Sequence, residues 1–149
     1  MLGGGDHKAR ILVVDDNPGD VELLRMALAE AGVNCDLTVL DNGREALEFV
    51  QGRGRFGAAP PPDLVILDLN LPRNDGTEIL EAMRATESYA ETPVAILSSS
   101  SSSREQAKVE GLRVKRFIVK PPDLDKYMRI GVILREVLAE ERARGIAEG

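Results

Sequence analysis

The sequence predicts an α/β protein built on a doubly wound, five-stranded parallel sheet with helices on both faces. Five short, continuous apolar runs occur along the 149 residues, and such runs are typical of strands buried on both faces of a parallel sheet. Segments with apolar residues at helical spacing separate the runs, and this strict alternation of strand and helix favours a parallel sheet. The length suits one domain with one core.

The first half of the chain supplies two strand–helix units. The first strand ends in two aspartates, after which Asn17 and Pro18 have the residue types of a helix N-cap and first helical residue. Gly32 ends that helix. The expected elements are a strand at 11–14, a helix from 18 to about 31, a strand at 37–40 and a helix over about 43–50.

The second half supplies three more strands. Six serines, Ser98 to Ser103, follow the fourth strand, and Asp123 caps a long last helix. The loop at 51–62, with its three consecutive prolines, is interpreted as an insertion, because too little chain precedes it to fold alone. The expected strands are at 64–67, 93–97 and 117–119. One helix is expected to begin at residue 76, a second to end near residue 110 and a third to begin at residue 124.

Domain boundaries and location follow from composition. We expect a flexible leader at 1–7, one folded domain over 8–142 and a short C-terminal tail at 143–149. Cys35 is the only cysteine, so no intramolecular disulfide can form and a reducing compartment is expected. The N-terminus lacks the apolar region of a signal peptide, and no apolar run approaches the roughly 20 residues that span a bilayer. We therefore expect a cytoplasmic protein with no membrane partner.

The charge argues against nucleic-acid binding. The formal net charge is −6, whereas neutralising phosphates requires clustered lysine and arginine. One short basic cluster, formed by Arg113, Lys115 and Arg116, is interpreted as a solvated turn.

Polar residues follow four of the five expected strands. Asp15 and Asp16 follow the first, Asp68 the third, Ser98 the fourth and Lys120 the fifth. Functional groups in an open α/β sheet gather beyond the carboxyl ends of the strands, so these side chains should share one edge. Their convergence carries the prediction of a functional site.

Three carboxylates at one edge repel one another, by about 4 kcal/mol for two unit charges 4 Å apart at an effective dielectric near 20. Lys120 and a hard divalent cation would offset this repulsion. Mg²⁺ prefers carboxylate and carbonyl oxygens and retained waters, with Mn²⁺ as an alternative. Asp16, Asp68 and the backbone carbonyl of Asn70 could supply that set, while Asp15 could act through a water or orient Lys120.

A carboxylate nucleophile beside a metal, a cation and a hydroxyl fits phosphoryl transfer to Asp68. The metal and Lys120 would neutralise charge on the phosphoryl oxygens, and Ser98 would donate a hydrogen bond to one of them. The only histidine, His7, lies in the leader, so a Ser-His-Asp triad is not expected, and the sequence has no GxxxxGKS/T phosphate loop.

Each residue also has an ordinary structural explanation when taken alone. Asp15 and Asp16 could belong to a turn before a helix cap, and Asp68 could be a polar loop residue. Ser98 could be part of a serine linker, and Lys120 could end any strand. Their joint occurrence at four strand ends favours a function.

These residues resemble the receiver domains of bacterial two-component response regulators over roughly residues 8–139. The matching pieces are Ile-Leu-Val-Val-Asp15-Asp16, Asp68-Leu-Asn-Leu-Pro72 with Gly76, Ile-Leu-Ser98, and Lys120-Pro121. The resemblance implies a flavodoxin-like strand order of 2-1-3-4-5. It also implies a single-domain regulator that switches partner contacts when phosphorylated. Such a regulator is not an enzyme, except that it catalyses its own phosphorylation and dephosphorylation.

The resemblance assigns roles to individual residues. It makes Asp68 the phosphorylated residue, Ser98 the switch hydroxyl and Lys120 the invariant lysine. Phe117 stands where many receivers carry tyrosine as the aromatic switch residue, and the bond from Lys120 to Pro121 is expected to be cis.

A narrower resemblance concerns the partner. Asp16-Asn-Pro-Gly-Asp-Val and the long loop before Asp63 are similar to small regulators paired with bacterial phytochrome histidine kinases. It implies that a phosphohistidine on a sensor histidine kinase donates the phosphoryl group.

The last helix carries two apolar stripes, and one stripe is enough to cover a sheet. The second stripe favours a homodimer through this helix; the alternative is a wide core face. The first stripe is Leu124, Tyr127, Met128, Gly131, Leu134 and Leu138, and the second is Ile130, Ile133 and Val137.

Two other functions stay open. A metal-dependent phosphatase usually has a second aspartate two residues after its nucleophile, and this position is Asn70, which cannot act as an acid. A receiver-like scaffold that is never phosphorylated usually lacks an acidic residue or the lysine, whereas this sequence keeps both.

Overall fold

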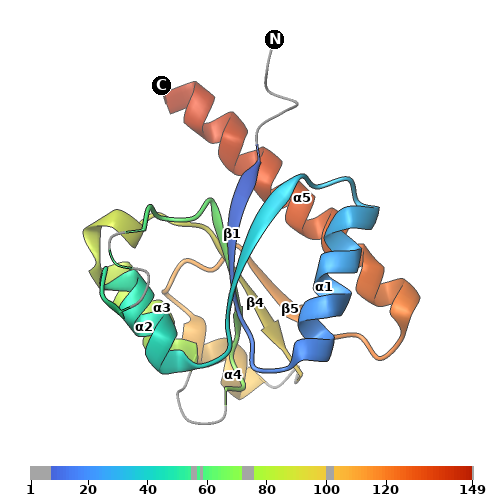
Figure 1. Ribbon diagram of the computed structural model, residues 1–149, viewed down its shortest axis with the longest axis horizontal. Coiled ribbons are helices and arrows are strands. Elements are labelled where there is room, and N and C mark those ends of the chain that lie inside the picture. Colours follow the sequence, from blue (N-terminus) through green and yellow to red (C-terminus); the bar gives the residue numbers. More distant parts are fainter. Residues whose placement is uncertain (1–7, 55–56, 58, 72–75, 100–102, 149) are drawn as a thin grey trace.

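The computed structural model describes residues 8–54, 57, 59–71, 76–99 and 103–148, with side chains as far as Arg144 (Figure 1). The predicted leader at 1–7, together with His7, Pro72 and the serines at 100–102, lies outside the described residues.

Five parallel strands form one sheet in the order β2-β1-β3-β4-β5, which confirms the predicted fold class and strand order. β1 and β2 each begin two residues earlier than predicted, where Ala9 pairs with Cys35. Arg10 and Asp36 interrupt the apolar runs but not the backbone pairing. The strands are β1 (Ala9–Val14), β2 (Cys35–Leu40), β3 (Leu64–Asp68), β4 (Val94–Ser98) and β5 (Arg116–Val119).

Helices follow the strands, and their predicted caps are confirmed. The side chain of Asn17 accepts hydrogen bonds from Gly19 N–H and Asp20 N–H at the start of α1. Asp123 accepts one from Lys126 N–H at the start of α5. The helices are α1 (Pro18–Glu30), α2 (Gly43–Val50), α3 (Gly76–Ala85), a short 3₁₀ helix η3 (Glu87–Tyr89), α4 (Ser103–Val109) and α5 (Leu124–Glu148).

The sheet separates two apolar layers. Along β1, Leu12 and Val14 face the layer covered by α2, α3 and α4, whereas Ile11 and Val13 face the layer covered by α1 and α5. Figure 1 shows these two groups of helices on opposite sides of the sheet. Among the described residues, none of the helices combines the length and apolarity that a bilayer crossing requires.

Helices α1 and α5 pack closely at a glycine. A Cβ atom at Gly131 would overlap the carbonyl group of Ala27, so only glycine allows this approach. Arg135 of α5 donates a hydrogen bond of 3.0 Å to the carbonyl oxygen of Ala31.

The two-stripe interpretation of α5 needs correction. Ile130 and Val137, assigned to the second stripe, are 2% and 0% exposed and belong to the core, whereas Leu124 of the first stripe is 53% exposed. The helix covers both the sheet and α1, so its buried face is wider than one stripe. α5 also continues through Glu148, so residues 143–148 of the expected C-terminal tail are helical.

The predicted basic turn is paired with acids. Arg113 contacts Glu91 at 3.1 Å and Lys115 contacts Glu141 at 3.0 Å. Arg116, at the start of β5, contacts Glu140, on α5, at 3.2 Å.

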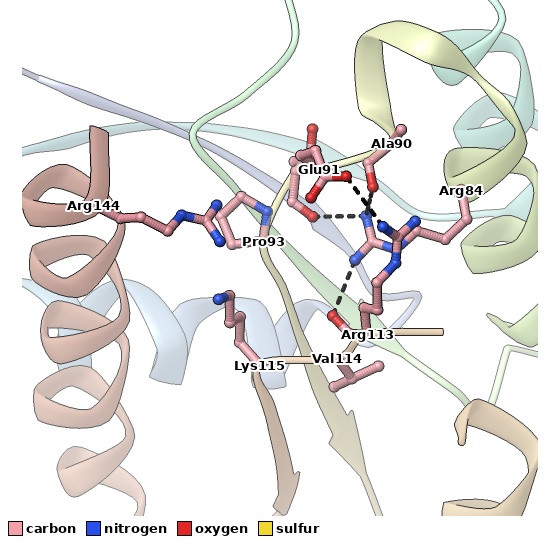
Figure 2. Close-up of a pocket in the computed structure, with 9 residues that line it drawn as sticks. Arg84, Ala90, Glu91, Pro93, Arg113, Val114, Lys115 and Arg144 are labelled. Carbon is pink, nitrogen blue, oxygen red and sulfur yellow. Dashed lines mark hydrogen bonds and ion pairs between the residues drawn. The ribbon is translucent and has the colours of Figure 1, made fainter. Parts of the chain in front are cut away.

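Arg84 of α3 joins the segments that precede β4 and β5 (Figure 2). It borders a cavity of about 290 Å³ that Arg113, Lys115 and Arg144 also line. The shortest hydrogen bonds of its guanidinium are 2.8 Å, to the carbonyl oxygens of Leu112 and Thr92. The other acceptors are the carbonyl oxygens of Tyr89, Ala90 and Arg113.

Candidate functional site

Four strand ends meet at one edge of the sheet, as predicted. Asp68 and Ser98 are the last residues of β3 and β4, and Asp15 and Lys120 directly follow β1 and β5. Carboxylate oxygens of Asp15, Asp16 and Asp68 lie within 4.8 Å of one another. Nζ of Lys120 lies 3.2 Å from Oδ2 of Asp68. The structure therefore brings the acidic residues and the lysine together.

Backbone groups orient the two buried carboxylates. Asp15 and Asp68 are 3% and 4% exposed, whereas Asp16 is exposed. Oδ1 of Asp15 accepts a hydrogen bond from Asn17 N–H at 2.9 Å, and Oδ1 of Asp68 accepts one from Asn70 N–H at 2.8 Å. In both residues the second oxygen faces Lys120.

Burial and neighbouring charges shift the pKa values of Asp15 and Lys120. Desolvation raises the pKa of Asp15 to about 6, although Asn17 N–H and Lys120 act in the opposite direction. Burial lowers the pKa of Lys120. The hydrogen bond to Asp20 and the carboxylates of Asp15 and Asp68 raise this pKa by a larger amount, so the net shift is upward. The ammonium therefore stays charged.

Sequence reasoning missed Asp20. Its Oδ2 atom lies 2.7 Å from Nζ of Lys120, closer than either Asp68 or Asp15. The available signal was a carboxylate in the first turn of the helix that follows the acidic pair, since that turn starts at the carboxyl end of β1.

Ser98 belongs to a second polar network. It is fully buried, and its hydroxyl donates a hydrogen bond of 2.8 Å to Oε2 of Glu105. The other oxygen of Glu105 accepts one of 2.7 Å from the side-chain amide of Asn70. Both the N–H and the hydroxyl of Ser99 donate to Oδ1 of Asn70. Glu105, also missed from sequence, thus connects α4 to the ends of β3 and β4.

The structure also describes Phe117 and Gly76, two other residues of the predicted pattern. Phe117 of β5 is half-buried and packs against the core on the side of the sheet that α4 covers. A Cβ atom at Gly76 would come within 2.9 Å of the backbone of Asp68 and Leu69, so this glycine lets α3 begin close behind the site.

The expected cis bond is absent. The bond between Lys120 and Pro121 is trans, since no described residue has a cis peptide bond. The trans form is also the lower in energy for most bonds to proline.

The donor set fits a hard divalent cation. Three carboxylates within 4.8 Å of one another are the ligand type that Mg²⁺ and Mn²⁺ take in proteins. Asn70 is tied to the site through its N–H, and the part of its carbonyl group in metal binding stays a prediction.

Comparison with known families decides the assignment. Residues 11–130 match the model of the response regulator receiver domain. The chain belongs to this family. A receiver domain accepts a phosphoryl group from a histidine kinase, and the matched residues contain all five predicted positions of the acidic, hydroxyl and lysine site.

Receiver domains of phytochrome-associated regulators are among the most similar proteins. The chain is 31% identical to response regulator Rcp1 of Synechocystis sp. over 80% of its own length and 82% of that protein. The structure of the phosphorylated cyanobacterial phytochrome response regulator RcpA is 30% identical, with a TM-score of 0.81, covering 89% of this chain and 95% of that one. The Mn²⁺-bound form of Rcp1 is 28% identical, with a TM-score of 0.75, covering 83% and 88%.

Proposed function

We propose that this receiver domain accepts its phosphoryl group on Asp68, with Lys120, Asp15 and Asp16 as the supporting charges. The observation that carries the proposal is the 3.2 Å contact between Oδ2 of Asp68 and Nζ of Lys120, beside two further carboxylates. Asp68 is the residue of this cluster that both ends a central strand and touches the lysine.

The transfer needs few steps from the protein. A carboxylate oxygen of Asp68 attacks phosphorus, a phosphorus–oxygen bond forms, and the bond from phosphorus to the donor histidine nitrogen breaks. The electron pair of that bond stays on the imidazole. Lys120 stabilises charge on the phosphoryl oxygens, and Ser98 donates a hydrogen bond to one of them.

The acidic pocket suits Mg²⁺, with Mn²⁺ as an alternative. Asp16 and Asp68 would hold the ion directly, with the Asn70 carbonyl group, and Asp15 would contribute through a water. When bound, the cation neutralises phosphoryl charge and brings the donor group to the carboxylate. Support comes from the relative that was solved in a Mn²⁺-bound form.

A bacterial phytochrome histidine kinase is the proposed donor. The similarity to Rcp1 and to the phytochrome response regulator RcpA supports this choice over an unrelated sensor kinase. The cytoplasmic location and the lack of nucleic-acid and membrane partners stay predictions from charge and hydropathy.

A homodimer through α5 also remains a proposal. Val132 is 37% exposed and the neighbouring Ile133 is half-buried. The apolar surface of α5 that a second copy could contact is therefore narrower than the two predicted stripes. Val132→Glu should lower the mass measured by sedimentation if the face joins two copies. An unchanged mass would contradict the dimer.

Transfer from a labelled kinase tests the function. A bacteriophytochrome kinase carrying ³²P on its histidine is mixed with the protein or with Asp68→Asn, in Mg²⁺, Mn²⁺ or a chelator. Label should move only to the unmodified protein and only with metal. Equal labelling of Asp68→Asn would refute the acceptor, and equal rates from an unrelated histidine kinase would refute the phytochrome assignment.

A further inference from the structure

The shortest ion pair of the site joins α1 to the end of β5. Nζ of Lys120 lies 2.7 Å from Oδ2 of Asp20, against 3.2 Å for Asp68 and 3.5 Å for Asp15. A lysine ammonium has three hydrogen-bond donors, and here three carboxylates surround it. The Lys120 side chain is 15% exposed and that of Asp20 is 23% exposed, so water screens this pair only partly.

Asp20 is itself held in place from two sides. Its N–H donates a hydrogen bond of 3.2 Å to the side-chain oxygen of Asn17, within the cap of α1. Its carbonyl oxygen accepts one of 3.3 Å from the hydroxyl of Tyr127, a residue of α5 that is 3% exposed. The carboxylate therefore projects from a backbone position fixed between two packed helices.

A carboxylate in the first turn of a helix is stabilising by itself, because it faces the positive end of the helix dipole. That effect needs no contact with a residue 100 positions away, yet Oδ2 of Asp20 lies 2.7 Å from Nζ of Lys120. Lysine has a long, flexible stem, so an ammonium with fewer contacts would sample positions away from Asp68.

We propose that Asp20 is a positioning residue for phosphoryl transfer. It holds the Lys120 ammonium at the carboxylate of Asp68, so that the positive charge is already in place when charge develops on the incoming phosphoryl oxygens. The inference rests on the proposed function, since it assigns a role within the same site.

The first test does not depend on phosphorylation. The chain has five lysines, and the side-chain ammonium signal of Lys120 can be assigned by nuclear magnetic resonance from its loss in Lys120→Met. In the unmodified protein this signal should be protected from exchange with water, and Asp20→Asn should remove most of the protection. Full protection in Asp20→Asn would overturn the proposal.

The second test separates rate from binding. With a small phosphodonor, Asp20→Asn should slow labelling of Asp68 about tenfold, the scale of one charge-assisted contact. The Mg²⁺ dissociation constant, measured by calorimetry, should change no more than in Glu22→Gln. This control removes the same charge from α1, where Glu22 is 72% exposed and contacts Arg25.

A double-mutant cycle tests whether Asp20 acts through Lys120. Asp20→Asn should have no further effect on the labelling rate in a Lys120→Met background. An equal slowing in both backgrounds, or a slowing no larger than that of Glu22→Gln, would overturn the positioning role. If the unmodified protein gains no phosphoryl group, the proposed function fails, and the ammonium signal still decides whether Asp20 holds Lys120.

Discussion

Ser98 donates a hydrogen bond of 2.8 Å to Glu105, which joins the end of β4 to the first turn of α4. The same carboxylate accepts a hydrogen bond from Asn70, two residues after Asp68. For its hydroxyl to bind a phosphoryl oxygen on Asp68, Ser98 must release Glu105. Under the proposed function, phosphorylation of Asp68 and the attachment of α4 would therefore compete for the Ser98 hydroxyl.

Removing Glu105 should favour the state in which Ser98 binds the phosphoryl group. A hydrogen bond to a charged group contributes about 1.5–3 kcal/mol, so Glu105→Ala should bind beryllofluoride, a phosphoryl mimic, about tenfold more tightly. Calorimetric titration in Mg²⁺ measures this affinity, with Glu110→Ala, an exposed acid just past α4, as the control. Weaker binding by Glu105→Ala than by the control would contradict the competition.

Divalent metal should stabilise the folded chain through the acidic cluster. Ligand that binds only the folded state adds about 2.7 kcal/mol at 100 times its dissociation constant, so Mg²⁺ should raise the thermal midpoint. Asp16→Asn should lose most of this increase, and without metal it should unfold no earlier than the unmodified protein, because one repelling charge is gone. An Mg²⁺ response equal to that of Glu136→Gln, an exposed site on α5, would argue against metal binding by Asp16.

Arg84 should matter for stability rather than for phosphorylation. Its guanidinium donates to five carbonyl oxygens, and Arg84→Ala would leave several of them without their donor, at a cost of about 3 kcal/mol or more. Arg84→Lys should restore little, because an ammonium lacks the planar fork. Urea denaturation measures the loss. A loss no larger than that of the exposed Arg129→Ala would contradict this account.

Alkaline titration should show both tyrosines protected. Burial, followed by the charge of Asp20, raises the pKa of Tyr127 to about 12, and burial raises the pKa of Tyr89. The unfolded chain loses these protons near pH 10, so stability should fall as the pH rises above about 10. The chain has two tyrosines and no tryptophan, so tyrosinate absorbance reports only these groups. A folded protein with an ordinary tyrosine midpoint would contradict the burial; Tyr127→Phe isolates Tyr89.

The strand ends were predictable because chain order and side-chain type both appear in the sequence. Five apolar runs predicted the parallel sheet. Parallel strands bring Asp15, Asp68, Ser98 and Lys120 to one edge, and this does not depend on the conformation of the loops. The predicted caps at Asn17 and Asp123 depend on local hydrogen bonds, and both formed.

Contacts between elements were not predictable in the same way. Asp20 and Glu105 lie on helices, and only the packing of α1 and α4 against the sheet brings them to Lys120 and Ser98. The stripes of α5 failed for a related reason, since Ile130 is buried by a wide face that meets both the sheet and α1.

Intact-protein mass after incubation with Mg²⁺ and a small phosphodonor tests the central claim most directly. The unmodified protein should gain about 80 Da, one phosphoryl group. Asp68→Asn should gain nothing, and neither should the unmodified protein in a chelator. A folded protein that gains no mass, or an equal gain in Asp68→Asn, would contradict the assignment of Asp68 as the phosphoryl acceptor.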